Sequence, residues 1–251
     1  MRMRFKPYAR PELLACDFHV HEPLNHGGHW HELYARPDQP WHLELGCGKG
    51  GFLAQIAPAH PDINYLGIDI TDKVLILAKR KIEAAYAEAG RPIDNVKIMS
   101  TDIERIKGVI TPEDTVSRIY INFCNPWSKN ASSNKHRLTY PRQLIQYRAF
   151  LEDGGEIYFK TDDDDLFRDS LEYFPASGYE ITWKTFDLHE NEPAWNIRTE
   201  HEGMFTEMGI KIKALIARKL PGDETVTWIE PKVLKKMAAA EAAAHGETAD
   251  A

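Results

Sequence analysis

The chain has 251 residues, a hydrophobic share of 43%, a charged share of 27% and a formal net charge of −7. This composition fits one sizeable α/β domain, excludes a membrane span and counts against bulk binding of nucleic acid, although a local basic groove stays compatible with it. The three cysteines are scattered and odd in number, which excludes a disulfide framework. The N-terminus carries prolines and charges in place of an apolar run, which excludes a signal peptide. Together these features predict a cytoplasmic protein.

Residues 1–40 are predicted to form an irregular N-terminal segment, basic at its start and rich in histidine. Prolines stand at positions 7, 11, 23, 37 and 40, and histidines at positions 19, 21, 26, 29 and 31. A zinc site needs a defined four-ligand set, and no cysteine or carboxylate spacing completes one here. We therefore expect a solvated loop and no metal.

The main domain, residues 41–230, opens with a strand, a glycine-rich turn, a helix and a second strand. Its parts are the strand Trp41–Leu45, glycines at positions 46, 48, 50 and 51, the helix Phe52–Ala57 and the strand Ile63–Ile70. Such a unit brings a ligand against a helix N-terminus at the strand ends, and glycines let the ligand approach the backbone.

The spacing of this loop fits two cofactors. Gly46, Gly48 and Gly51 satisfy the dinucleotide pattern G-x-G-x-x-G, with Asp69 placed for ribose hydroxyls. Glu44 with the glycines also fits the E-x-G-x-G-x-G loop of methyltransferases that bind S-adenosylmethionine. The carboxylate of Glu44 can hold the ammonium of that cofactor, whereas it would repel a pyrophosphate. We therefore favour S-adenosylmethionine.

Strands and helices alternate along the rest of the domain. The predicted helices are Thr71–Gly90, Pro141–Leu151, Asp164–Phe174 and Thr199–Met208, and the predicted strands are Val96–Met99, Val116–Phe123, Ile157–Lys160, Tyr179–Phe186, Lys211–Ala217 and a small extra one at Thr225–Ile229. This order predicts an α/β three-layer sandwich with a mostly parallel seven-stranded sheet and an antiparallel last strand. Residues 231–251 end in an alanine- and charge-rich run, so we expect a flexible tail.

Three polar stretches are expected to meet at the carboxyl ends of the strands, namely Asn122–Tyr140, Lys160–Asp165 and Thr199–Glu202. The first carries Trp127, which can stack on a flipped base, beside Asn125, which can form a hydrogen bond, and Lys129, which can hold phosphate. The alternative makes Trp127 a core residue and Asn125 part of a turn. Asp102, after the third strand, can reach an adenine amino group or act as a cap.

Four motifs in order resemble one known family. They are LELGCGKGGF in the glycine loop, NPWSK followed by KHRLTY, KTD at Lys160–Asp162 and TEHE at Thr199–Glu202. Over residues 1 to 218 the chain resembles bacterial tRNA (guanine-N7-)-methyltransferases. The resemblance implies a Rossmann-like class I methyltransferase fold and transfer of a methyl group to a guanine in the tRNA variable loop. It implies no stable protein partner, and a monomer or homodimer.

The resemblance also implies roles for single residues. Glu44, Asp69 and Asp102 would bind S-adenosylmethionine together with the loop glycines. Asn125 would contact the cofactor and take part in catalysis. The residues implied to hold tRNA are Lys129, Asp162, Thr199, Glu200, His201 and Glu202.

One departure affects the catalytic position, because Asn125 stands where the family usually has aspartate. Guanine N7 has a free lone pair and no proton, so methyl transfer to it needs no general base, and we expect an active enzyme. Three alternatives stay open. They are a methyltransferase for another RNA or a small molecule, a nicotinamide-dependent oxidoreductase that uses the G-x-G-x-x-G subset, and a catalytically idle tRNA-binding homologue.

Overall fold

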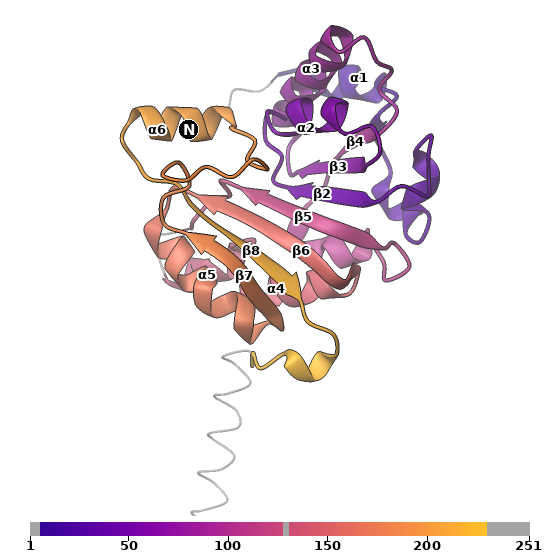
Figure 1. The fold of residues 1–251 in the computed structure, drawn as a ribbon. Coiled ribbons are helices and arrows are strands. Elements are labelled where there is room, and N and C mark those ends of the chain that lie inside the picture. Colours follow the sequence, from indigo (N-terminus) through magenta and orange to yellow (C-terminus); the bar gives the residue numbers. More distant parts are fainter. Residues whose placement is uncertain (1–5, 128–130, 230–251) are drawn as a thin grey trace, which may run out of the picture.

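The computed structural model describes residues 6–127 and 131–229 (Figure 1). Its centre is an eight-stranded sheet in the order β1-β4-β3-β2-β5-β6-β8-β7. The strands are β1 His19–Val20, β2 Trp41–Leu45, β3 Asn64–Asp69, β4 Val96–Ser100, β5 Val116–Asn122, β6 Leu151–Thr161, β7 Tyr179–Thr185 and β8 Lys213–Lys219. The helices are α1 Ala9–Leu14, α2 Leu53–Ala59, α3 Asp72–Glu88, α4 Pro141–Arg148, α5 Asp164–Ala176 and α6 Glu200–Glu207.

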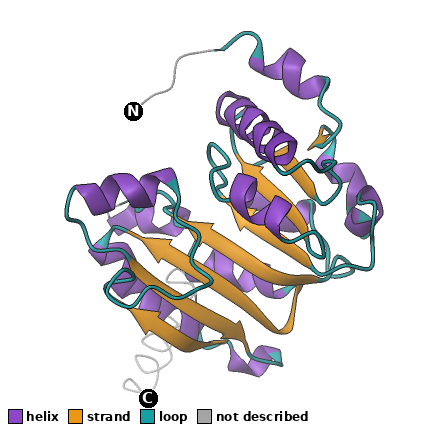
Figure 2. Ribbon diagram, turned by 45° about the horizontal axis from the view of Figure 1, so that its top comes forward, coloured by secondary structure: helices purple, strands orange, loops and turns teal. Residues whose placement is uncertain are grey.

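Helices cover both faces of the sheet, and this gives the three layers that the sequence predicts (Figure 2). Successive residues of β3 show the alternation, because Tyr65 belongs to the hydrophobic cluster under α1, α2 and α3, whereas Leu66 belongs to the cluster on the other face. β8 is antiparallel to β6 and β7, and the other pairs are parallel. The predicted α/β class, its mostly parallel sheet and its antiparallel last strand are confirmed.

The N-terminal segment corrects the expectation of an irregular loop, because α1 and the eighth strand lie in it. β1 pairs in parallel with β4 at the edge of the sheet, through His19 opposite Ile98 and Val20 opposite Met99. The segment is ordered because apolar residues between its prolines pack into the core, where Leu13 and Trp30 are fully or almost fully buried. Three of the five histidines, at positions 19, 26 and 31, are also half-buried, whereas those at positions 21 and 29 are exposed.

Packing against tryptophans accounts for the burial of some of these histidines. The His26 ring lies edge-on to Trp30, and the His31 ring lies edge-on to Trp41. Imidazole rings that pack in this way contribute to the core of the segment as well as to its surface.

Two further boundaries differ from the predictions. The short strand expected over Thr225–Ile229 is absent from the described part of the chain, where the 3₁₀ turn Asp223–Thr225 is followed by one bridge from Val226 to Ser177. β6 begins at Leu151, before the predicted start at Ile157, and runs through Gly154. A register shift against β5 accommodates the additional residues, because it leaves part of them unpaired. Among the described helices, none has the length and apolar character needed to span a membrane.

Candidate active site

The glycine loop connects β2 to α2 and folds back onto the end of β3. The backbone N–H of Gly46 donates to the carbonyl of Ile68 at 2.8 Å, which holds the start of the loop against the neighbouring strand. Gly48 and Gly50 have positive φ angles of 54° and 73°, which favour glycine. At Gly50 a Cβ atom would also lie 2.7 Å from the Cβ of Ala78 on α3, so a side chain does not fit there.

Asp69 ends β3 beside this loop and organises it. Its carboxylate accepts one hydrogen bond from the N–H of Gly48 at 3.1 Å and another from the N–H of Thr71 at 3.2 Å. Burial raises the pKa of Asp69, and these backbone donors oppose that shift. The carboxylate therefore fixes the turn at the same place where a ligand would meet the strand ends.

Glu44 lies at the end of β2 and is 3% exposed. Its Oε1 accepts a hydrogen bond from the side-chain amide of Asn122 at 3.0 Å, whereas its buried Oε2 has no partner within the structure. Burial raises the pKa of Glu44 to about 8, while Asn122 and the positive charge of Lys160 act in the opposite direction. A buried carboxylate oxygen without a donor is costly, so this position fits a ligand that brings a cation or an N–H group.

Asp102 lies after β4 and acts as a cap in this structure. Its Oδ1 accepts a hydrogen bond from the N–H of Glu104 at 3.0 Å and so begins the 3₁₀ segment Ile103–Gly108. This matches the cap that the sequence left open as an alternative. The second carboxylate oxygen leaves room for a ligand contact, because one aspartate oxygen suffices for the cap.

The loop after β5 carries the motif Asn125-Pro126-Trp127. The side-chain oxygen of Asn125 accepts a hydrogen bond from the N–H of Trp127 at 3.0 Å and closes a tight turn. Phe123 and Trp127 have φ angles of 52° and 51°, a conformation that costs energy for residues other than glycine and is common at functional sites. The Trp127 side chain is 40% exposed, so it is no core residue.

Arg137 is buried and anchors this loop to the rest of the protein. It is 2% exposed, donates from Nε to the carbonyl of Pro126 at 2.6 Å and forms an ion pair with Asp169 on α5. This arginine of the KHRLTY motif is therefore a buried support for the loop. Lys129, the lysine of the NPWSK motif, lies outside the described residues.

The KTD and TEHE motifs meet the same edge of the sheet. Thr199 caps α6 by accepting a hydrogen bond from the N–H of Glu202, and the His201 ring lies nearly parallel to that of Phe123, with 6.4 Å between centroids. Glu200 is exposed and forms an ion pair with Lys81 on α3. Asp162 is half-buried, and burial raises its pKa. The structure thus brings the three predicted stretches together.

Glu202 differs from its neighbours in the TEHE motif because it is completely buried. One of its oxygens accepts a hydrogen bond from the ammonium of Lys160 at 2.7 Å. The other accepts from the side-chain amide of Asn196 at 2.7 Å. A glutamate with both oxygens bound inside the protein is not free to contact a substrate, which corrects the expectation for this residue.

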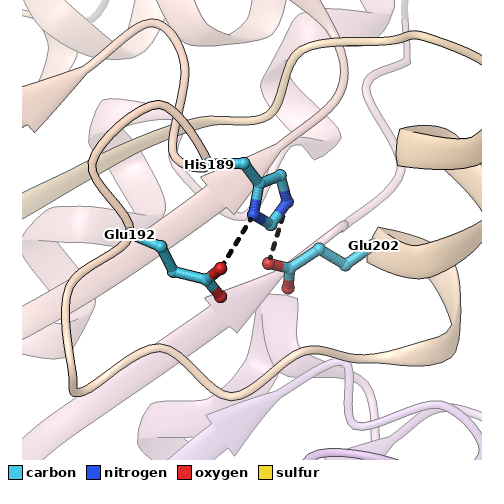
Figure 3. A group of neighbouring side chains, drawn as sticks. All are labelled: His189, Glu192 and Glu202. Carbon is cyan, nitrogen blue, oxygen red and sulfur yellow. Dashed lines mark ion pairs between the residues drawn. The ribbon is translucent and has the colours of Figure 1, made fainter.

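Figure 3 shows the ring of His189 between the carboxylates of Glu192 and Glu202, with 3.4 Å between the nearest atoms on each side. The three residues have the donor atoms of a metal site. Lys160 and Arg198 already neutralise the two carboxylates, so a divalent cation would add uncompensated charge to a buried group. The cluster is therefore better described as a polar anchor between α6 and the loop that precedes it.

Asn122 and Lys160 are site residues that we did not single out from the sequence. Asn122 is the last residue of β5 and Lys160 the last but one of β6, and together they connect Glu44 with α6. A polar residue at the carboxyl end of a strand, directly after apolar residues, is the signal that the sequence offers. It was missed because both residues were interpreted as the beginnings of motifs.

Comparison with known proteins agrees with this geometry. A family model described as "Putative methyltransferase" matches residues 38–215. A tRNA (guanine-N(7)-)-methyltransferase of Clostridium perfringens strain SM101 is 56% identical over 88% of this chain and 100% of its own length. The Clostridium beijerinckii protein of the same name is 58% identical over 87% of this chain and 99% of its own length.

Among solved structures, the 16S rRNA methyltransferase KamB is similar in fold, with a TM-score of 0.53 and 12% identity over 87% of this chain and 96% of that one. At this identity the likeness concerns the fold alone. The Clostridium proteins share more than half of the aligned residues over almost their whole length. The chain therefore belongs to the tRNA (guanine-N(7)-)-methyltransferase family.

Proposed function

We propose that this protein transfers a methyl group from S-adenosylmethionine to N7 of a guanine in the variable loop of tRNA. The proposal rests on Oε2 of Glu44, which is buried beside the glycine loop and has no hydrogen-bond partner among the described residues. Glu44 lies one strand away from the loop that exposes Trp127. The activity of the Clostridium relatives, as their names give it, supports the same conclusion.

The cofactor side consists of Glu44, the loop glycines and two aspartates. Glu44 would accept hydrogen bonds from the cofactor ammonium, and Gly46 and Gly48 would leave room for the ligand beside the backbone. Asp69 and Asp102 would take part through oxygens at the ends of β3 and β4. When bound, S-adenosylmethionine supplies a methyl group on a sulfonium, which is a strong leaving group.

The acceptor side consists of the loop after β5 and the start of α6. The exposed ring of Trp127 can stack on a guanine. Lys129 would contact the backbone of tRNA, and the residues proposed to surround the guanosine are Asp162, Thr199, Glu200 and His201. Glu202 would act indirectly, because both of its oxygens are bound inside the protein.

The chemistry asks mainly for alignment of the two substrates. Since N7 of guanine carries no proton, no residue has to act as a general base. Holding the lone pair in line with the methyl group supplies most of the acceleration that such a site can give. Asn125 would contribute its amide to this arrangement without a full negative charge, so it stabilises the cationic product less than an aspartate does.

The direct test is methyl incorporation into an unmodified tRNA transcript, followed by nucleoside analysis for 7-methylguanosine. We expect label in tRNA and none in a matched transcript whose variable-loop guanine is replaced by adenine. Absence of label at saturating cofactor would contradict the proposal. Label in a small-molecule extract but not in tRNA would favour a metabolite methyltransferase.

One observation favours a second candidate, an idle tRNA-binding homologue. The side-chain oxygen of Asn125 is already bonded to the N–H of Trp127, which leaves less of the amide for chemistry. That candidate predicts tRNA binding that weakens with salt and no turnover, with activity restored by Asn125→Asp. The proposal made here predicts turnover without any substitution.

A further inference from the structure

Lys160 is a buried lysine at the carboxyl end of β6, where it belongs to a row of polar groups. Glu44 on β2 accepts a hydrogen bond from Asn122 on β5, and Asn122 is the register partner of Lys160 on β6. Partners in register point their side chains to the same face of the sheet, so the three residues lie side by side. Lys160 is 3% exposed, so its charge lies inside the protein.

The ammonium of Lys160 is fully used by the protein itself. It donates to Oδ1 of Asn196 at 2.7 Å, to the carbonyl of Ile197 at 2.9 Å and to Oε2 of Glu202 at 2.7 Å. An ammonium has three protons, and each has an acceptor here. Lys160 therefore has no free donor for a substrate, because two of its bonds go to the segment that leads into α6 and the third to the first turn of α6.

Glu202 carries this connection into the helix. It lies in the first turn of α6, directly after Thr199, Glu200 and His201. Because the Glu202 carboxylate is completely buried and bound on both oxygens, the turn that carries these three residues is fixed relative to β6. In Figure 1, α6 lies beyond the arrowheads of β5 and β6, which agrees with this attachment.

The backbone of Lys160 also contacts the loop after β5, which is the second segment of the acceptor side. Its carbonyl accepts a hydrogen bond from the N–H of Phe123 at 2.9 Å, at the point where β5 leads into the loop with Asn125 and Trp127. The Phe123 ring in turn lies nearly parallel to that of His201. One residue thus contacts both segments between which the guanine would be received.

We propose that Lys160 is a positioning residue for methyl transfer. It fixes the position of the first turn of α6 relative to the loop 123–127. The inference rests on the proposed function, because it concerns the acceptor side of that same site. A buried ion pair adds little net stability compared with two apolar side chains of similar size. The contribution of the Lys160–Glu202 pair is therefore to the placement of α6.

The test replaces the pair by apolar residues of similar size, Lys160→Met together with Glu202→Leu. This change removes one positive and one negative charge, so the net charge of the Lys160–Glu202 pair stays zero. We expect a folded protein with a lower melting temperature, because Asn196 and the carbonyl of Ile197 lose partners, and a cofactor Kd within about threefold. The kcat/KM for tRNA should fall about 100-fold, since a displacement of about 1 Å in a site has that effect.

A matched control is Lys219→Met. Lys219 is also a strand lysine that donates to a backbone carbonyl, that of Leu151 at 2.6 Å, and pairs with Asp153. It lies at the other end of β8 from Lys213, which is the partner of Thr161 at the end of β6. We expect its substitution to leave tRNA methylation unchanged.

A folded double variant that methylates tRNA like the unchanged protein overturns the inference. An equal loss of cofactor affinity and tRNA turnover overturns it as well, because the effect would then act through Glu44. If the double variant does not fold, Asn196→Ser decides, since it removes one acceptor of Lys160 from a half-buried position. Unchanged kcat/KM in that variant overturns the inference, and a loss of about tenfold supports it. An unchanged protein that fails to methylate tRNA contradicts the proposed function instead.

Discussion

The cofactor side and the acceptor side of this site are built in different ways. Most of the cofactor side comes from one continuous stretch, residues 41–71, closed by backbone hydrogen bonds and by Asp69, and Asp102 adds one contribution from the end of β4. The acceptor side is assembled from segments far apart in the chain, as in the bond between Lys160 and Glu202, which are 42 residues apart. The cofactor side should therefore tolerate substitutions in other parts of the chain. The acceptor side depends on buried polar contacts that lie away from the reacting atoms.

The largest expected effect on the cofactor side is that of Glu44→Ala. Loss of a buried carboxylate that receives the cofactor ammonium should weaken S-adenosylmethionine binding about 100-fold, which corresponds to about 2.8 kcal/mol and lies within the range of such charged contacts. Calorimetric titration measures the Kd directly. Glu44→Gln is the matched control, since it keeps the shape and removes the charge, and it should also bind weakly. Retained affinity in Glu44→Gln would mean that charge at this position is unimportant.

Neighbouring glycines sharpen the contrast within the cofactor side. Gly50→Ala should lower the free energy of unfolding by about 3 kcal/mol, because it combines a positive φ with a Cβ 2.7 Å from that of Ala78. Gly51→Ala is the control, since its Cβ would meet only the flexible end of Glu200 among the atoms within 3 Å. Chemical denaturation compares the two. Equal destabilisation would contradict the role of the loop conformation.

On the acceptor side, Arg137→Met tests whether a distant support sets the rate. We expect kcat/KM for tRNA to fall about 30-fold, because the carbonyl of Pro126 loses its donor and the loop with Asn125 shifts. The cofactor Kd should stay within about twofold. Arg142→Met is the matched control, since Arg142 lies close by in the sequence, in α4, and pairs with Glu104 near the surface. Loss of cofactor binding in Arg137→Met would contradict the separation of the site into a cofactor side and an acceptor side.

The sequence was sufficient for the parts whose signal is local. The strand, glycine turn, helix and strand of residues 41–70 follow from short apolar runs and from glycine spacing, and the order of the elements predicted the antiparallel last strand. The mid-chain motif identified the loop that exposes Trp127.

Long-range contacts explain what the sequence did not reveal. β1 has only two residues, which is too short for a periodic pattern, and pairing with β4 creates it. Arg137 and Glu202 are charged residues in polar runs, so they were expected at the surface. Each is buried because its partner, Asp169 or Lys160, comes from another element, and such pairs are invisible without the fold.

The smallest expected effect is the pH dependence of cofactor affinity, which sharpens the account of Glu44. Burial raises its pKa to about 8, so the free protein holds a proton on this carboxyl at neutral pH. An ammonium ligand binds the carboxylate, and binding therefore releases that proton. Affinity should rise about fivefold between pH 6.5 and 7.5, because the gain in carboxylate outweighs the partial loss of charge from an amino group whose pKa is about 7.8.

Calorimetry in two buffers of different ionisation enthalpy measures the released proton, and Glu44→Gln should release none. The same shift has a defined sign for stability. Because the folded state binds this proton more tightly than the unfolded state, the contribution of Glu44 becomes less favourable as pH rises from about 4.5 to about 8 and is constant above that. Glu44→Gln should remove this part of the pH dependence of unfolding. A flat cofactor affinity over the range, in a protein that still binds, would show that Glu44 is ionised before the ligand arrives.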